Sequence, residues 1–448
     1  MRRSTKPSAV RLPPALPALL ALALPAGACV RPPDSGARLP VTRYVNAYWL
    51  EGDRFVHGGR GVAGSRFIDD TSAPAARRVD LGGAWVVPAF GDAHTHNLDG
   101  DASTIAAYRR EGVAYVQVLT NTPAGRERIA SVLESPGAPK VAYANGGITS
   151  TYGHPMIAYE PRAMGIDWSE FRARRDEICA SRLLEGKAYW FVDDEADLEL
   201  RWDSILAGRP DVLKIFLLRA AEHPEEPACD DFGRIGLAPA VAREVVRRAH
   251  ARGLRVWAHV ETADDFALAV DIGVDGIAHL PGYAFRTVDP DEPRADYLID
   301  RATAHRTGEA DIVVTPTVSL ISSYAREDSV LVREARAVQR ENLARLIDGG
   351  VRIAIGSDWY GRTAWDEVEA LASLGMFTPA DLLTAWSVTT PRAIFPERRV
   401  GTLEPGAEAT FLGLSCDPRE RLECLREIEL RVTEGIALET VAPPANAR

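Results

Sequence analysis

An apolar run that ends in two closely spaced histidines reads Val86-Val87-Pro88-Ala89-Phe90-Gly91-Asp92-Ala93-His94-Thr95-His96. Its apolar part, 85–90, predicts a buried strand, and the polar part follows directly after it. Residues two apart in an extended chain face the same way, roughly 6–7 Å apart, so two imidazoles can converge on one ion. An ordinary surface pair of histidines would also fit this stretch, so its meaning depends on the rest of the chain.

Short apolar runs continue downstream and alternate with helical stretches, at 113–119, 141–145, 212–218, 254–260, 276–280, 312–318 and 352–357. This alternation is typical of parallel strands joined by crossover helices. Eight consecutive β/α units, counting 85–90, favour a closed (β/α)8 TIM barrel over an open doubly wound sheet. No Gly-x-Gly-x-x-Gly follows the first run, so no dinucleotide cofactor is expected.

Strand-like segments flank the predicted barrel at 42–49, 78–87, 401–414 and 427–432. They predict a small β unit at each end of the chain, 41–84 and 399–440, around a barrel of 85–398. The connection after the third run, 146–211, is far longer than an ordinary βα loop, and we expect it to lie over the active-site face. Its basic cluster of Arg172, Arg174 and Arg175 is interrupted by acidic residues, as on a solvated helix face.

The first thirty residues have the layout of a secretory signal, in which basic residues precede an apolar stretch at 16–24 and a small-residue run that ends at Cys29. We expect 1–29 to be a lipoprotein-type signal peptide with Cys29 as the lipidation site, and 30–40 to be a tether. Cleavage and release is the alternative, because Pro25 and Ala26 match the lipoprotein signal loosely. In both cases we expect an exported, periplasmic or cell-envelope protein that meets the membrane only through such an anchor.

The composition is that of a globular protein, with 46% hydrophobic and 26% charged residues. A net charge of -11 argues against a nucleic-acid surface, so the expected partner is a small-molecule or peptide-like substrate. A homo-oligomer is left open. An oxidising compartment would permit disulfides, although free buried thiols are the alternative, among Cys179, Cys229, Cys416 and Cys424. Of these, Cys416 and Cys424 are close enough in sequence to clip a local loop.

Further polar residues end other strands of the predicted barrel. His259 ends the fifth run, His279 ends the sixth, and Asp358 directly follows the eighth. Catalytic groups of a barrel come from the C-terminal ends of different strands, so these residues join His94 and His96 in one predicted ligand cluster. The cluster suits one or two divalent metal ions; zinc is the default expectation, and iron, manganese and nickel stay open.

Lys214 lies inside the fourth run, where a charge needs a partner or a modification. A pairing with a carboxylate, or a side chain that reaches the barrel mouth, is the alternative to a metal role. Candidate substrate contacts are His154, Tyr283 and Trp359, each of which equally suits a turn or a packing role. Structural or exposed positions are expected for His57, His223, His250 and His305.

Together these motifs resemble the amidohydrolase superfamily, especially its imidazolonepropionase-like and prolidase-like branch. The resemblance rests on the opening stretch, on the strand-ending histidines, on Gly356-Ser357-Asp358, and on a tail at 400–410 that resembles the return to a small β-sandwich subdomain built from both chain ends. It spans 41–414. Ala89, Gly91 and Thr410 replace the more usual glycine, isoleucine and aspartate, and none of these changes removes a ligand.

The resemblance implies a role for each ligand. His94, His96 and Asp358 would hold the more buried metal, His259 and His279 the other, and a carbamylated Lys214 would bridge them. Asp358 would also be the catalytic base, passing a proton from metal-activated water to the leaving nitrogen. The expected reaction is hydrolysis of an amide, cyclic amide or dipeptide-like carbon–nitrogen bond. Lactone, ester or phosphotriester hydrolysis on the same metals is one alternative, and an anchored binding protein that has lost catalysis is another.

Overall fold

The structure is a computed structural model that describes residues 39–438 except for 70–73, 288–289 and 326–327. The predicted signal peptide, Cys29 and most of the tether lie outside the described residues, so those expectations stay predictions. Pro40–Arg448 form one compact unit, to which everything below refers. Within the described residues, no helix combines the length and the apolar character needed to cross a bilayer.

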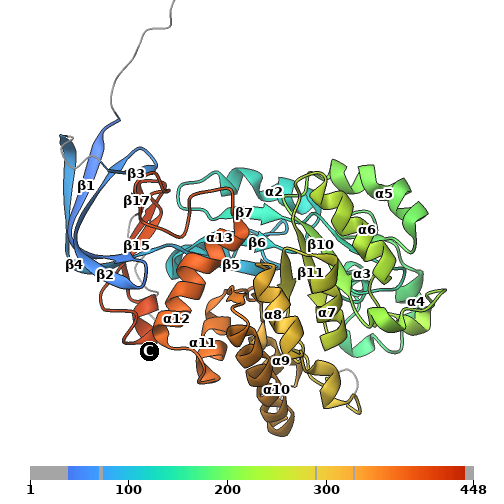
Figure 1. Cartoon of the computed structure of the whole chain (residues 1–448). Coiled ribbons are helices and arrows are strands. Elements are labelled where there is room, and N and C mark those ends of the chain that lie inside the picture. The colour runs from blue at the N-terminus through green and yellow to red at the C-terminus, as the bar shows by residue number, and fades with distance from the viewer. Residues whose placement is uncertain (1–38, 70–73, 288–289, 326–327, 439–448) are drawn as a thin grey trace, which may run out of the picture. The chain divides into compact units, whose positions relative to one another are not determined.

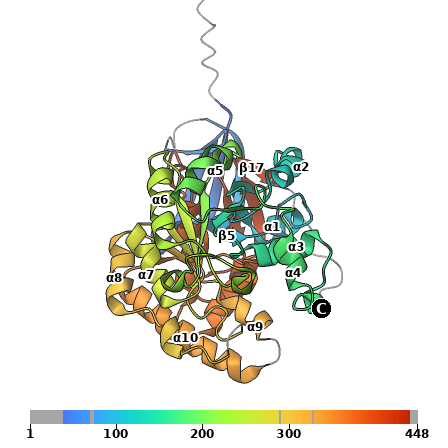
Figure 2. The same ribbon diagram turned by 90° about the vertical axis from the view of Figure 1, so that its right-hand side faces the viewer.

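Short parallel strands form the barrel, with helices around them (Figures 1 and 2). In chain order the strands are β5 (Phe90–Thr95), β6 (Val113–Val118), β7 (Lys140–Tyr143), β8 (Gly147–Thr149), β10 (Leu213–Leu217), β11 (Val256–Val260), β12 (Gly276–Ala278), β13 (Val313–Thr315) and β14 (Arg352–Ile353). Their neighbours follow the orders β5-β6-β7 and β14-β13-β12-β11-β10-β8. The predicted barrel is confirmed, with several strands shorter than the apolar runs that predicted them.

Two features close the barrel. β7 and β8 are two halves of the third strand: β7 pairs with β6 and β8 with β10, and the chain turns between them at Asn145 and Gly146, whose φ angles are 53° and 100°. On the other side, the Ala93 N–H donates to the Ile355 carbonyl at 2.8 Å, which joins β5 to the residues after β14. Together these contacts complete the ring.

The first barrel strand begins later than the sequence predicts. β4 (Ala75–Pro88) belongs to the small sheet, and β5 starts at Phe90, so the segment from Asp92 to Thr95 lies inside the strand rather than after it. Pro88 has no N–H to donate to a ladder, and the Ala89 N–H donates to the Thr410 carbonyl at 3.2 Å. The same ribbon therefore leaves one sheet and enters the other at this point.

Helices cover the outside of the barrel. They are α1 (Ile105–Glu111), α2 (Pro123–Leu133), α5 (Glu195–Ala207), α6 (Pro239–His250), α7 (Ala263–Ile272), α8 (Arg301–Glu309), α9 (Ile321–Tyr324), α10 (Ser329–Asp348), α11 (Trp365–Ser373), α12 (Pro379–Thr384) and α13 (Thr390–Ile394). In α6, the buried residues Val241, Val245 and Ala249 repeat at helical spacing and form one apolar stripe. α7 begins at Thr262 and Asp265, which cap each other's backbone N–H groups.

The long connection predicted at 146–211 has three parts. β8 is a barrel strand and α5 is a barrel helix that contacts α6, so only 150–194 is an insertion. We call 150–194 the lid. It contains α3 (Met156–Ala163), α4 (Arg175–Ala180) and β9 (Tyr189–Phe191), and β9 adds to the edge of β8 in parallel. The predicted bounds were wrong at both ends, because a strand and a helix of the barrel were included.

Among the described residues, seven strands from both chain ends form one sheet in the order β17-β16-β15-β4-β1-β2-β3. Besides β4, they are β1 (Val41–Glu51), β2 (Arg54–Ala63), β3 (Arg66–Ile68), β15 (Phe411–Leu414), β16 (Ile428–Thr433) and β17 (Ile436–Leu438). The sheet curls on itself, since the Phe67 N–H donates to the Ala407 carbonyl at 3.0 Å. Trp49, Phe67 and Phe411 pack inside it with ring centroids 5.5 to 6.2 Å apart, so the subdomain predicted from both chain ends is confirmed.

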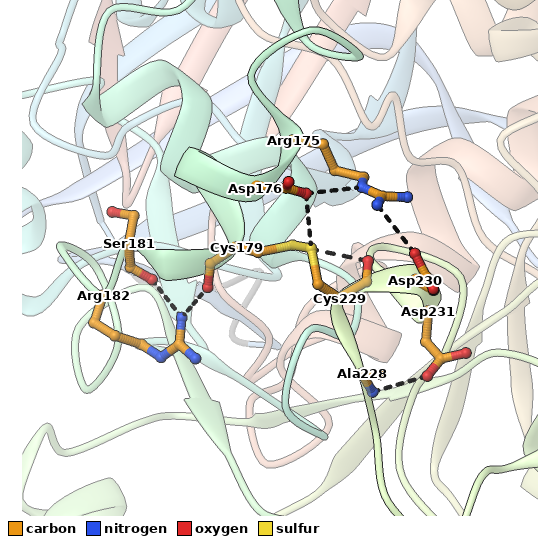
Figure 3. The surroundings of a disulfide bond; sticks show 9 residues. All are labelled: Arg175, Asp176, Cys179, Ser181, Arg182, Ala228, Cys229, Asp230 and Asp231. Atoms are coloured by element: carbon orange, nitrogen blue, oxygen red, sulfur yellow. Dashed lines mark hydrogen bonds and ion pairs between the residues drawn. A yellow bond between two sulfur atoms is a disulfide. The ribbon is translucent and has the colours of Figure 1, made fainter.

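Both cysteine pairs are disulfides. Cys416 and Cys424 clip a local loop beside the small sheet, and we call this bond the sheet disulfide. Cys179 and Cys229 form the lid disulfide, which joins α4 to η3 (Cys229–Asp231), a short helix between β10 and α6 (Figure 3). The alternative of free thiols at these four positions is wrong.

Candidate active site

Four histidines and Asp358 meet at the C-terminal ends of the barrel strands. One oxygen of Asp358 lies 3.2 Å from His94 Nε2 and 2.8 Å from His96 Nε2, and the other lies 3.8 Å from His279 Nδ1. The rings of His259 and His279 are 4.4 Å apart between centroids. His94, His279 and Asp358 bring their ligand atoms within 4.8 Å of one another. The structure thus brings together the residues that the strand-end pattern singled out.

Lys214 faces the same centre from β10. It is 1% exposed, and its Nζ has no hydrogen-bond partner within the described residues. Burial lowers the pKa of Lys214 to about 7, against the opposing attraction of Asp358. The alternative of an ion pair is not seen in the described part of the chain, because Lys214 has no carboxylate partner within 4 Å.

The histidines are suited to bind a metal because they are neutral. Burial lowers the pKa of His94, His259 and His279 well below its ordinary value, so each ring keeps a free lone pair at neutral pH. Nitrogen atoms of His94 and His259 have no hydrogen-bond partner in the part of the chain that is described. Buried nitrogens are costly to leave in this state, and a set of imidazoles and one carboxylate fits a divalent transition-metal ion.

Hydroxyl groups hold two of the imidazoles. Thr120 Oγ1 lies 2.9 Å from His96 Nδ1 and accepts a hydrogen bond from the Tyr159 O–H at 2.8 Å. Thr317 Oγ1 lies 2.7 Å from His279 Nδ1. Such contacts at the second ring nitrogen fix the orientation of a metal-binding histidine. Because Tyr159 belongs to α3, the lid is connected to a candidate ligand through a single threonine.

The backbone is strained at two of the candidate ligands. His279 and Asp358 have φ angles of 76° and 51°, in the left-handed region that residues with a Cβ seldom adopt. Each such residue costs about 1–3 kcal/mol and persists only when its surroundings hold it. The Asp358 N–H donates to the His94 carbonyl at 2.6 Å, which ties this strained residue to β5.

Asp92, the first polar residue of the opening motif, fastens β5 to the end of β14. Its carboxylate accepts hydrogen bonds from the Ser357 N–H at 3.1 Å and the Ser357 hydroxyl at 3.0 Å, and from the Tyr108 hydroxyl at 3.2 Å. Burial raises the pKa of Asp92 to about 7. Asp92 therefore positions the two segments that carry His94 and Asp358 without pointing at the centre itself.

Two of the three predicted substrate contacts lie beside the ligands. The His154 ring is 4.6 Å from the His259 ring, and the Tyr283 ring stacks on His279 at 4.2 Å. The Trp359 ring instead lies against the Arg362 guanidinium, 4.7 Å away. The next residue, Tyr360, lies beside the candidate ligands instead of Trp359, and its ring stacks on that of His96 at 5.1 Å. Four other histidines were expected to be structural or exposed. Three of them, His57, His223 and His250, lie within hydrogen-bond distance of other polar side chains, and His305 is exposed.

Cavities open on both sides of the ligands. The smaller, about 580 Å³, is lined by His96, Tyr159 and Tyr360. The larger, about 1040 Å³, ends inward at His154, Tyr283 and Glu261. A substrate whose reacting bond lies at the ligands can therefore extend in two directions.

Glu261, which the sequence analysis missed, lies 3.6 Å from His259 Nε2 and accepts a hydrogen bond from the Tyr283 O–H at 3.3 Å. Burial raises its pKa. Its spacing was an available signal, because a residue two after His259 at the end of a strand faces the same way. Thr120 and Thr317 gave a similar signal, since each lies at the end of a predicted run.

Comparison with known proteins identifies the class. The Amidohydrolase family model matches residues 213–429. An imidazolonepropionase of Syntrophobacter fumaroxidans is 26% identical over 359 residues, which is 75% of this chain and 75% of that protein. An imidazolonepropionase of Deinococcus radiodurans is 25% identical over 372 residues, which is 77% of this chain and 81% of that protein.

Solved structures agree on the fold. A Xaa-Pro dipeptidase with bound methionine aligns at a TM-score of 0.67 and 18% identity, over 89% of this chain and 100% of that one. Ochratoxinase of A. niger aligns at a TM-score of 0.66 and 17% identity, over 89% and 96%. The chain thus resembles the amidohydrolase superfamily, through the family match at 213–429 and the similarity to imidazolonepropionases over three quarters of its length. It is accordingly a hydrolase of the class that acts on carbon–nitrogen bonds.

Proposed function

We propose that the protein is a metal-dependent hydrolase that cleaves an amide bond at the centre formed by His94, His96, His279 and Asp358. One observation carries this proposal: a carboxylate from the end of β14 lies within 4 Å of imidazoles from the ends of β5 and β12. Three strand ends converge on a space that could hold one ion, and burial lowers the pKa of His94 and His279, so these two imidazoles are neutral at neutral pH. Zinc is the proposed ion.

A divalent ion, when bound, supplies a Lewis acid that polarises the amide carbonyl and lowers the pKa of water. The chain's own residues provide the rest. Asp358 is the only carboxylate among the candidate ligands, so it accepts the proton from the attacking water and returns it to the leaving nitrogen. Tyr283 and His154 line the larger cavity beside the ligands and orient the substrate. The lid reaches the centre through Tyr159, whose hydroxyl donates to Thr120 beside His96.

We also propose that Lys214 carries a carbamate and that, when two ions bind, it would hold the second with His259 and His279, leaving His94, His96 and Asp358 to the first. Burial lowers the pKa of Lys214 to about 7, so a large fraction of its amine is neutral at neutral pH. The neutral amine is the form that adds CO2, with loss of one proton. The Nζ atom has no hydrogen-bond partner among the described residues, which supports this proposal. A buried ammonium would stay unpaired there, whereas a carbamate could bind metal ions.

Metal content and turnover, measured together, test the function. We expect one or two metal ions per chain by mass spectrometry, and hydrolysis of members of a panel of dipeptides, N-acyl amino acids and cyclic amides. Asp358→Asn should keep most of the metal and lose about 10²–10⁴-fold in kcat. Turnover restricted to lactones, esters or phosphotriesters would overturn the amide assignment. If the protein binds no divalent ion after reconstitution, the proposal of a metal-dependent hydrolase would be overturned and a binding protein would be favoured.

We propose further that the protein is exported and lipid-anchored at Cys29. Its two disulfides support export, because such bonds persist in oxidising compartments. Cys29→Ser should move the protein from the membrane fraction to the soluble periplasmic fraction. The same distribution for both proteins would mean that Cys29 is not the anchor.

A further inference from the structure

The larger cavity is bounded by two segments that are far apart in the sequence. The lid contributes Phe171 and Arg175 to one wall, and the connection from β10 to α6 contributes Asp230 and Phe232 to the other. At its inner end, His154, Tyr283 and Glu261 each contact His259 or His279. Three residues of the cavity lining are therefore in direct contact with candidate ligands.

Covalent and polar links fasten the two walls to each other. The lid disulfide joins Cys179 of α4 to Cys229, and beside it Arg175 reaches across to Asp230 at 3.0 Å (Figure 3). Deeper in, the Gly233 N–H donates to the Tyr152 carbonyl at 2.8 Å. These links tether the two walls to each other across the cavity.

The lining between the walls is largely apolar and aromatic. Phe171 of the lid stacks on Phe232 of the opposite wall, with ring centroids 5.5 Å apart, and Ile157 and Tyr324 complete the apolar lining. Phe232 is buried at 6% exposure, so the disulfide-bonded wall keeps this ring in place. A volume of about 1040 Å³ is at the upper end of small-molecule pockets. A small cyclic amide would leave most of it filled with water.

We propose that the larger cavity receives a large apolar or aromatic group on one side of an open-chain amide, and that the lid disulfide fixes the wall that this group contacts. This inference rests on the proposed amide hydrolysis at the same centre. The smaller cavity, which His96 lines, receives the other side of the amide. Cys179 and Cys229 are therefore positioning residues that act through the Phe171–Phe232 pair.

Two series of substrates test the shape of the cavity. One extends the acyl group of an N-acyl amino acid from acetyl to octanoyl and phenylacetyl, and the other extends the amine side of an acetyl amide. In one of the two series we expect kcat/KM to rise about 100-fold, because each added apolar group gains contact with the wall. Equal turnover along both series, or a small cyclic amide as the best substrate, would overturn the inference.

The two disulfides provide a matched pair of variants. The double variant C179S/C229S should lose about tenfold in kcat/KM for the largest substrate, through KM, and less than about twofold for the acetyl substrate. The double variant C416S/C424S, which removes the sheet disulfide, should change neither value. Metal content should equal that of the parent in both variants. Equal losses on large and small substrates in C179S/C229S would overturn the role of the lid disulfide.

A second variant tests the wall if C179S/C229S does not fold. Phe232→Ala keeps both disulfides and should show the same selective loss for large substrates. If the parent protein holds metal but hydrolyses no amide, the proposed function fails and this inference fails with it. If it hydrolyses amides without regard to size, the proposed function stands and only this inference fails.

Discussion

Replacing Thr120 with valine should weaken metal binding without disturbing the fold. Valine keeps the shape of threonine but removes the oxygen that contacts His96 Nδ1 at 2.9 Å and accepts the Tyr159 O–H at 2.8 Å. When Nε2 of His96 binds an ion, Nδ1 carries the proton and donates it to Thr120. Two buried hydrogen bonds are lost, at about 1 kcal/mol each, so affinity should fall about 30-fold.

Competition with a chromophoric chelator measures this change directly, and circular dichroism checks the fold. Tyr159→Phe, which removes only one of the two bonds, should weaken affinity about fivefold. Tyr189→Phe is the matched control, because the Tyr189 hydroxyl donates to Glu160 within the lid and contacts no candidate ligand. Parent-like affinity in Thr120→Val would refute the reasoning, and so would an equal loss in Tyr189→Phe.

Three further perturbations test other parts of the structure. Gly356→Ala should destabilise the protein by about 1–3 kcal/mol and weaken metal binding, because a Cβ there would lie 2.7 Å from the backbone nitrogen of His94. Urea denaturation measures the change, and Gly208→Ala is the control, which should be neutral because its nearest neighbour would be 3.5 Å away. Burial raises the pKa of Glu367 to about 7, so the folded state keeps a proton that the unfolded state releases near pH 4.5. The free energy of unfolding should therefore fall by up to about 3 kcal/mol as the pH rises from 4.5 to 7. Glu367→Gln should flatten this profile, and parallel profiles for the two proteins would contradict the shift. Removing the lid disulfide, which spans 50 residues, should lower the free energy of unfolding by about 4 kcal/mol, because a long closed loop restricts the unfolded chain most. Removing the sheet disulfide, which spans 8 residues, should lower it by about 2.5 kcal/mol. Equal losses of stability in calorimetric melting would contradict this chain-entropy argument.

The barrel and the positions of its ligands were predictable because both depend on local patterns. Apolar runs mark buried parallel strands whatever their partners are, and residues at the ends of such strands must meet at one face. His94, His259, His279 and Asp358 satisfied both conditions, and the structure places them together. The ligand cluster therefore needed no knowledge of long-range contacts.

Other parts of the site depend on contacts that no local pattern shows. Thr120 matters only because β6 lies beside β5, and Tyr159 only because α3 folds back over both. Trp359 was expected to contact substrate, because the position after Asp358 was expected to face the candidate ligands. The left-handed φ of 51° at Asp358 turns the chain, so that Tyr360 stacks on His96 instead.

The basic cluster in the lid was only partly understood. Arg174 pairs with Glu177 at 2.8 Å, as expected of a solvated helix face. Arg172 and Arg175 line the larger cavity, and Arg175 pairs with Asp230 of the opposite wall at 3.0 Å. Composition alone could not separate these arginines, since the partner of Arg175 lies in a segment far along the chain.

The pairing of β4 with β15 gives the order of synthesis a consequence. Residues 85–88 of β4 bond to residues 411–414, although the ribosome produces β4 long before β15 at about 5–20 residues per second. During that delay β4 presents an unpaired apolar edge, which is a template for aggregation. A chain that stopped before Phe411 would contain every candidate ligand and yet leave this edge open. The strands made last thus cover the edge that would promote aggregation, whereas all the candidate ligands are made earlier.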